Sequence, residues 1–218
     1  MVGYYESPTQ LDQGAEIVTL GGVAKFPSLW ETNQAHKDFL LHYRAILFLE
    51  DDIEIRFEDV DRLFDVFCHF DLALAQPSLS HRSYCSWPIT LCCPSFRLRF
   101  TNFVEIMAPL FSAFALARCL DTFHRSTSGW GLDLTWPALL GHPRDRIAII
   151  DEVVVTHTKP IDPQNGRLYQ YLRSIGVDPY QELHALSEQH GLGPDHVLRQ
   201  YGGVLSPQVG PERRVRFV

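Results

Sequence analysis

The chain has 218 residues, of which 45% are hydrophobic and 21% are charged, proportions typical of a globular protein. This length fits one sizeable α/β domain or two small ones. The 19 Lys and Arg residues against 26 Asp and Glu residues give a net charge of −7, which disfavours a general nucleic-acid-binding role. No apolar run reaches the roughly 18–20 residues that a membrane-spanning helix needs, so no transmembrane segment is expected.

The cysteines and the amino-terminal sequence bear on the cellular compartment. The cysteine count is five, an odd number, and the opening MVGYYESPTQ lacks the pattern of a signal peptide. We therefore expect a reducing, cytoplasmic location. Cys92 and Cys93 are adjacent, without CxxC spacing or a matching His/Cys pair, which favours a structural or incidental role over metal binding.

The first half of the chain alternates predicted helices and strands. Apolar spacing predicts helices over 30–43 and 57–70. Between them, RAILFLE (44–50) predicts an apolar strand of the kind that is buried on both faces of a parallel sheet. LALAQPSL (72–79) predicts a second short strand, stopped by Pro77. This order predicts an α/β sheet with right-handed crossovers, in which ligands collect beyond the carboxyl ends of the strands.

The second half mixes strands with helices and ends in helices. The predicted elements are a strand at 96–100, a helix at 112–123, a loop and short helix within 126–141, a strand pair or one bent strand at 146–157, and helices at 167–176 and 179–191. We expect the last stretch, 206–218, to be a loosely held tail. The chain then divides into an α/β domain at 1–165 and a helical extension with its tail at 166–218, packed on the same domain.

The acidic triplet Glu50, Asp51 and Asp52 directly follows the first apolar strand. Carboxylates at a strand end can hold a divalent cation such as Mg²⁺ or Mn²⁺, which would offset their mutual repulsion. Glu50 and Asp52 would point to the same side of an extended segment. The alternative is a solvated loop that leads into the helix at Phe57, with Glu58 favouring the helix dipole.

Four further segments carry candidate site residues. His157 ends a buried strand, where it is either a metal ligand or a hydrogen-bonded structural group. In SGWGLD (128–133), two glycines free the backbone to present Trp130, a flat apolar face on which a sugar ring can stack. Asp133 follows as a catalytic carboxylate or as a helix N-cap. Glu105 lies near a strand end, where a salt bridge or a turn hydrogen bond competes with a role in ligand binding. Lys25 lies near glycines, where it could meet a phosphate.

The order of these motifs carries a resemblance. The acidic triplet, then AQPSLS, RFTNFVEIMAPLFS, SGWGLD and AIIDEVVVTHTKP, resembles the family called domain of unknown function 707, over residues 25–169. That family is similar to nucleotide-sugar glycosyltransferases of the A-type fold, a Rossmann-like mixed sheet flanked by helices. The resemblance implies that 50–52 is a DxD-type motif, with Glu50 in place of the usual first aspartate. It also implies that Glu50, Asp52 and His157 bind Mn²⁺ or Mg²⁺.

The same resemblance implies roles for the remaining candidates. Asp133 would take the proton from the attacking hydroxyl, and Trp130, Gly131, Glu105 and Lys25 would bind substrate. The implied function is transfer of a sugar from a nucleotide-sugar donor to an acceptor hydroxyl whose identity the sequence does not give. A non-catalytic sugar- or nucleotide-binding module with the same fold is the alternative, and a metal-dependent hydrolase using the same Asp/His set is a third interpretation. If Asp52 and His157 share a metal, their side-chain atoms should lie within about 5 Å of each other.

One feature departs from the A-type pattern. Such folds open with a base-binding strand, a helix and a second strand, whereas only about 45 residues precede AILFLEDD here. VGYYES (2–7) is a candidate remnant of the second strand, and the fold is expected to be short at its amino-terminal end. We therefore expect metal and diphosphate to bind, the nucleoside to be gripped weakly, and an apolar sheet edge to remain exposed.

Overall fold

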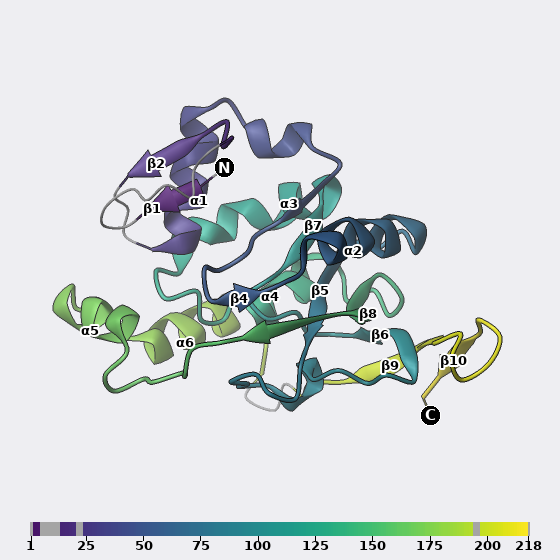
Figure 1. Ribbon diagram of the computed structural model, residues 1–218. Helices are drawn as coiled ribbons and strands as arrows, with labels where there is room; N and C mark the ends of the chain where they lie inside the picture. The colour runs from purple at the N-terminus through teal and green to yellow at the C-terminus, as the bar shows by residue number, and fades with distance from the viewer. Residues whose placement is uncertain (1, 5–13, 21–23, 194–196, 218) are drawn as a thin grey trace.

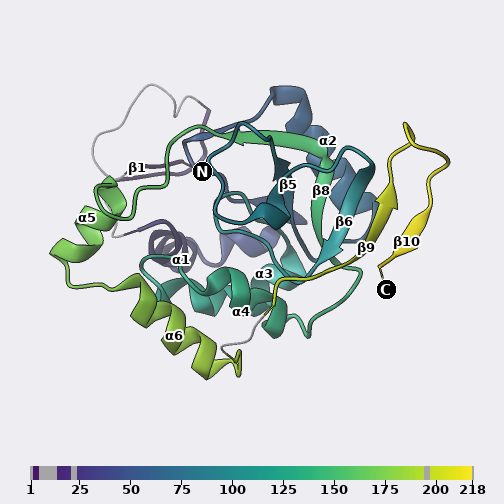
Figure 2. The same cartoon turned by 90° about the horizontal axis from the view of Figure 1, so that it is seen from below.

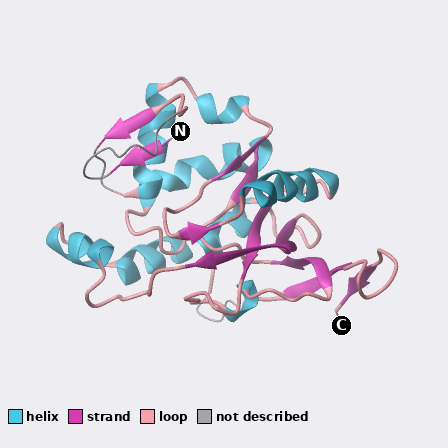
Figure 3. Ribbon diagram, in the orientation of Figure 1, coloured by secondary structure: helices cyan, strands magenta, loops and turns pink. Residues whose placement is uncertain are grey.

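The computed structural model describes residues 2–4, 14–20, 24–193 and 197–217. This part of the chain is an α/β structure with a mixed, mostly antiparallel sheet of eight strands and six α-helices around it (Figures 1 and 3). The helices are α1 (Lys25–Ala35), α2 (Phe57–His69), α3 (Ala113–Cys119), α4 (Leu132–Leu139), α5 (Arg167–Ser174) and α6 (Pro179–Gln189). None of these helices is both long and apolar enough to cross a membrane.

The sheet places strands in the order β10-β9-β6-β8-β5-β7-β3, and β4 pairs with the far end of β8. The strands are β3 (Ala45–Leu47), β4 (Ile53–Glu54), β5 (Leu74–Leu79), β6 (Phe96–Thr101), β7 (Leu110–Ser112), β8 (Ile147–His157), β9 (Gln200–Leu205) and β10 (Arg214–Arg216). Only β5 and β8 are parallel neighbours in this sheet. The predicted α/β fold with a mixed sheet flanked by helices is thus confirmed.

Helices cover both faces of the sheet because alternate strand residues point to opposite sides. On one face, Leu63, Val66 and Phe67 of α2 pack with strand residues in one core cluster. On the other face, α1, α3, α4 and α6 contribute to a second core that includes fully buried Trp136. Figure 2 shows these four helices gathered on one side. Phe26 of α1 meets the Trp136 ring edge-on at 5.5 Å, which ties α1 to α4.

The strand expected at 44–50 is shorter and more exposed than predicted. β3 covers only Ala45–Leu47, pairs antiparallel with β7, and lies at the end of the strand order. All three of its residues are only partly buried. The prediction of a strand buried on both faces of a parallel sheet is therefore wrong, because β7 returns between β3 and β5 and leaves β3 at the edge.

Pro77 does not stop its strand. β5 runs to Leu79, and its pairing with β8 shifts register between Pro77 and Ser78. Proline cannot donate a ladder hydrogen bond, so an irregularity there lets the strand continue. Pro77 pairs with Ile150 and the next residue, Ser78, pairs with Val154, so the β8 residues between Ile150 and Val154 have no partner in β5. Of the two alternatives for 146–157, one bent strand is the correct one.

Two other boundaries differ from expectation. The first helix begins at Lys25 and ends at Ala35, and a separate 3₁₀ helix covers Phe39–His42. Asn33 causes the break, because its side chain accepts from the Leu40 amide and donates to Asp38, which has positive φ.

The tail expected at 206–218 is not loose over Arg214–Arg216, since β10 pairs antiparallel with β9. β9 itself, paired to β6, was not predicted.

The amino-terminal strands form a separate small sheet. β1 (Val2–Tyr4) and β2 (Val18–Leu20) pair with each other in parallel. Part of VGYYES is therefore a strand, as expected, whereas its last three residues lie outside the described part of the chain. Helices α2, α3 and α4 and the strand at 96–100 agree with the predictions within a few residues, as do α5 and α6.

Candidate functional site

The acidic triplet lies in the turn between β3 and β4, where β4 brings it to the carboxyl end of β8. Ile53 of β4 pairs with His157, the last residue of β8. The Thr158 amide and hydroxyl both donate to the main-chain oxygen of Asp52 at 2.9 Å. Two segments far apart in the sequence are therefore joined by backbone pairing, which fixes the histidine beside the triplet.

The side chains of Asp52 and His157 meet in this site. Nε2 of His157 lies 3.5 Å from Oδ2 of Asp52, within the separation expected of two residues that share a metal. The other ring nitrogen, Nδ1, is 2.8 Å from the main-chain oxygen of Tyr84. Nδ1 donates to that oxygen in the neutral ring, so the lone pair of Nε2 faces Asp52. Oδ1 of Asp52 is buried without a hydrogen-bond partner in the described structure.

Two lysines compensate the charge of the triplet. Nζ of Lys25, the first residue of α1, lies 3.2 Å from Oε1 of Glu50 and donates to the main-chain oxygens of Ile106 and Met107. Burial lowers the pKa of Lys25, while the charges of Glu50 and Asp52 act in the opposite direction. Lys159 lies 3.2 Å from Asp51, a side chain that is 89% exposed. Ion pairing therefore explains part of the stability of this acidic run without a cation.

The fit of a divalent cation differs among the three predicted ligands. Asp52 and His157 suit it, because one offers an unpartnered buried oxygen and the other an imidazole nitrogen held by a backbone carbonyl. Glu50 faces Lys25 instead. Within the described ranges, no three His, Cys, Asp or Glu side chains are grouped so that they could hold a metal ion. The assignment of Glu50 as a third ligand remains a prediction.

Two buried carboxyl groups lie behind the triplet. Glu105 is 4% exposed, its amide donates to Oε1 of Gln76 at 2.6 Å, and its Oε2 is without a hydrogen-bond partner in the described structure. Burial, then the charges of Asp133 and Glu50, raise the pKa of Glu105 to about 8. Burial also raises the pKa of Asp133 to about 7, although backbone hydrogen bonds oppose this. Both groups can therefore exchange a proton near neutral pH.

Asp133 is not a helix N-cap. Helix α4 begins at Leu132, and Gly131 is its N-cap residue, with φ of 86° and no side-chain cap. The Asp133 carboxylate accepts instead from the amide of its neighbour Leu134 at 3.0 Å. The capping alternative for Asp133 is therefore wrong. The structure shows Asp133 as a buried carboxyl group whose pKa is raised.

The loop that carries Trp130 is anchored by helix α6. Glu182 accepts from the amides of Thr127 and Ser128, both at 2.8 Å, and from the hydroxyls of Ser126 and Ser128. Gly131 faces α6 as well, because a Cβ atom there would lie 3.1 Å from Cα of Leu183. The structure thus gives Gly131 a packing role, and its predicted contact with substrate stays a prediction.

The C-terminal helices contribute site residues that sequence reasoning missed. The Trp130 ring lies 6.3 Å from that of Tyr169 on α5 and 5.0 Å from that of Tyr180 on α6. Burial is the main cause that raises the pKa of Tyr169, and the charge of Glu50 acts in the same direction. The signal available in the sequence was the tyrosine-rich pair of predicted helices directly after the His157 strand.

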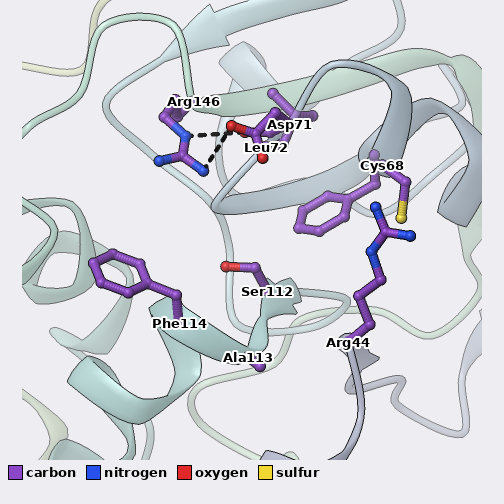
Figure 4. A pocket seen from close by; sticks show the side chains of 9 residues that line it. Arg44, Cys68, Asp71, Leu72, Ser112, Ala113, Phe114 and Arg146 are labelled. Carbon is purple, nitrogen blue, oxygen red and sulfur yellow. Dashed lines mark hydrogen bonds and ion pairs between the residues drawn. The ribbon is translucent and has the colours of Figure 1, made fainter.

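A hollow at the other end of these strands is a separate feature. A cavity of about 260 Å³ is lined by Arg44, Phe67, Cys68, Asp71, Leu72, Ser112, Ala113, Phe114 and Arg146, at the amino ends of β3, β5 and β8 (Figure 4). Arg146 donates to the main-chain oxygen of Asp71 at 2.9 Å and pairs with its carboxylate at 3.1 Å. None of the predicted site residues lines this cavity, so it does not belong to the acidic site.

Comparisons with known proteins add no further assignment: no family model matches the chain, and no curated protein matches it.

Proposed function

We propose that this protein is a metal-dependent glycosyltransferase with an A-type fold, which transfers a sugar from a nucleotide-sugar donor to an acceptor hydroxyl. The observation that carries the proposal is the pairing of Asp52 with His157 at the carboxyl ends of β3 and β8. Oδ2 of Asp52 faces Nε2 of His157, and Oδ1 of Asp52 is unpartnered in the described structure, so the two side chains would supply two protein ligands for Mn²⁺ or Mg²⁺. The resemblance of the motif order supports the same interpretation.

The proposed roles follow from the position of each group. Asp52 and His157 would hold the cation, whose chemistry is to neutralise the diphosphate of the donor and of the leaving group. A protein with a net charge of −7 needs such a positive centre to bind a polyanion. Lys25 donates hydrogen bonds to Glu50 and to the main-chain oxygens of Ile106 and Met107. It thereby fixes the 106–107 segment beside the acidic triplet. Glu105 lies behind, close enough for its charge to interact with Asp133 and Glu50.

Asp133 is the proposed general base. Its pKa of about 7 leaves a substantial ionised fraction at neutral pH, and its burial strengthens its pull on a proton. The acceptor oxygen forms a bond to the anomeric carbon while its proton passes to Asp133. The bond between that carbon and the diphosphate oxygen breaks, and the diphosphate leaves with the bonding electrons. A single displacement of this kind inverts the anomeric centre.

A non-catalytic binding module is the second candidate. Glu50 is already paired with Lys25, which would weaken metal binding. Asp133 and Glu105 are partly protonated near neutral pH, which would weaken base catalysis. Turnover separates the two candidates, since a binding module would bind the donor without cleaving it.

The direct test is a thermal-shift screen of UDP-, GDP-, ADP- and CDP-sugars with and without Mn²⁺. A ligand that binds the native state at 100 times its Kd adds about 2.7 kcal/mol to the free energy of unfolding. We expect at least one nucleotide sugar to raise the melting temperature only when Mn²⁺ is present, and then to be hydrolysed or transferred slowly. If no nucleotide sugar raises the melting temperature in Mn²⁺, both the transferase and the donor-binding module are excluded.

A further inference from the structure

The cavity at the amino ends of β3, β5 and β8 has more hydrogen-bond donors than acceptors. The side chain of Arg44 makes no ion pair or hydrogen bond with any described residue. Arg146 donates through Nε to the main-chain oxygen of Asp71 and pairs through Nη2 with its carboxylate, so Nη1 has no partner in the described structure. The Ser112 hydroxyl accepts from the Ala115 amide at 3.1 Å, which leaves its hydrogen free to donate.

These donors lie around one space. Figure 4 shows Arg146 and Asp71 on one side of the cavity and Arg44 on the other, with its guanidinium beside Cys68. Ser112 lies between the two arginines in the same view. A group that offers only acceptor atoms would therefore be flanked by donors on both sides.

The charge of the lining residues favours a carboxylate. Arg44, Arg146 and Asp71 together leave one net positive charge in the cavity. A guanidinium binds a carboxylate through two parallel hydrogen bonds, and a single carboxylate neutralises this charge. A phosphate dianion would leave an excess of negative charge beside Asp71. The match between one carboxylate and the cavity is local, because the whole chain has a net charge of −7.

The remaining walls are apolar and limit the size of the ligand. Phe67 and Leu72 are each 2% exposed, whereas the Phe114 ring is 61% exposed and Arg118 lies over it, 5.7 Å from the ring centroid. An apolar ligand body placed against Phe114 would remove part of this ring from water. The cavity volume of about 260 Å³ is below the roughly 300–1,000 Å³ of sites for drug-sized ligands, so the body is compact.

Backbone hydrogen bonds of the sheet hold the cavity walls in place. The Ala113 amide donates to the main-chain oxygen of Arg44 at 3.1 Å, and the Ser112 amide donates to that of Ala73 at 2.9 Å. The Ala73 amide in turn donates to the main-chain oxygen of Arg146 at 2.8 Å. The two arginines and the serine are thus fixed to three neighbouring strands, and a ligand binds with little ordering of the backbone.

We propose that this cavity binds a small carboxylic acid with a compact apolar body. Arg44 and the free Nη1 of Arg146 bind the carboxylate, the Ser112 hydroxyl donates to it, and the apolar body lies against Phe114. This site is separate from the acidic triplet and does not depend on the proposed transferase function, since none of the residues assigned to that function lines the cavity.

The test measures binding of phenylacetate by ligand-observed NMR, with phenylacetamide as its uncharged counterpart. We expect phenylacetate to bind and phenylacetamide to bind at least about 10-fold more weakly, because the amide lacks the charge. Arg44→Gln should weaken phenylacetate binding by roughly 10- to 100-fold, the range of a charged hydrogen bond. Its exposed, unpaired side chain can be replaced without loss of folding, which the melting temperature checks. Phe114→Ala should weaken binding by roughly 2- to 10-fold.

The matched control is Arg56→Gln, at an exposed arginine before α2 that pairs with Asp59 and does not line the cavity. This variant and Asp52→Ala should both bind phenylacetate like the wild type, whatever the result of the nucleotide-sugar screen. Phenyl phosphate and inorganic phosphate complete the set of probes. The inference is overturned if phenylacetate does not bind with a Kd below about 10 mM, if Arg44→Gln binds it normally, or if phenyl phosphate binds more than about 10-fold tighter.

Discussion

The imidazole of His157 is clamped between the main-chain oxygen of Tyr84, 2.8 Å from Nδ1, and the carboxylate of Asp52, 3.5 Å from Nε2. The backbone contact at Nδ1 sets the tautomer of the neutral ring, and the lone pair of Nε2 can then bind a metal ion. In the structure, Asp52 and His157 lie at the distance of an ion pair. With a cation between them, the same two side chains would become ligands, and the unpartnered Oδ1 of Asp52 would gain a partner.

Replacing Asp52 should remove metal-dependent ligand binding. We expect Asp52→Ala to abolish the increase in melting temperature that UDP produces in the presence of Mn²⁺, because half of the proposed ligand pair is lost. The matched control is Asp59→Ala on α2, which breaks only the ion pair with Arg56 at 2.8 Å. Differential scanning fluorimetry with and without Mn²⁺ measures both. Equal loss in the two variants would mean that the acidic residues act only through general charge.

Replacing Asp133 should separate chemistry from binding. As the base, Asp133→Asn should lower kcat by roughly 10²–10⁴-fold, because the amide cannot take the proton. Donor binding should remain, since Asp52 and His157 are untouched. Initial-rate kinetics together with a UDP titration measure the two effects. Wild-type turnover in Asp133→Asn would remove this residue from the mechanism.

The raised pKa values predict how stability depends on pH. The pKa of Glu105 is about 8 in the folded protein against 4.5 for the free side chain, so the folded state holds a proton that the unfolded state has lost between these values. The stabilising contribution is fully present below pH 4.5 and is lost as the pH rises toward 8. One such group changes the free energy of unfolding by about −1.4 kcal/mol per pH unit in this window.

Glu105→Gln should therefore flatten the pH profile. Urea unfolding from pH 5 to pH 8 with EDTA present measures the slope, and we expect the variant to lose stability less steeply than the wild type. Glu58→Gln, at an exposed carboxylate in the first turn of α2, is the control and should keep the wild-type slope. An identical slope in wild type and Glu105→Gln would contradict a proton held on Glu105.

The amino-terminal part of the fold leads to a prediction about nucleoside recognition. β1 and β2 form their own small sheet, and β3 ends the strand order of the main sheet, so a base-binding strand next to β3 is not part of the described structure. We expect UDP and GDP to bind no more than about 100-fold tighter than pyrophosphate in Mn²⁺, which corresponds to about 2.7 kcal/mol. Calorimetric titration of all three ligands decides this. A larger preference would demonstrate a nucleoside pocket.

Local patterns in the sequence predicted the helices better than the sheet. The apolar stripe of α2 repeats every three to four residues, and this repeat is a property of the segment itself. The edge position of β3 depends instead on β7 returning between two strands that are distant in sequence. β9 was missed because its two adjacent glycines, Gly202 and Gly203, resemble a turn. Both are required by close backbone contacts, with Val215 and with Leu98.

The candidate site shows the same limit. Carboxylates after an apolar strand and a histidine at the end of another are visible in the sequence, and β4 does bring Asp52 to His157. The ion pair of Lys25 with Glu50 could not be predicted, because it depends on where α1 lies over the sheet. Glu182 was equally hidden, since nothing in its own helix indicates that it accepts hydrogen bonds from a loop before α4.

Two glycines with the same backbone conformation give a test of how α6 positions the Trp130 loop. Gly131 and Gly141 have φ of 86° and 79°, so alanine at either position is strained by about 1–2 kcal/mol. At Gly141 a Cβ atom meets nothing within 4 Å, whereas at Gly131 it would lie 3.1 Å from Cα of Leu183, a backbone atom of α6.

Gly131→Ala should therefore cost more stability than Gly141→Ala, by an additional ~1–3 kcal/mol of overpacking. It should also displace α6 from the loop, because the new Cβ atom would lie too close to the backbone of that helix. Urea unfolding of both variants measures the difference in stability. Equal destabilisation in both variants would show that α6 moves freely with the loop, and a positioning role for the helix would then be wrong.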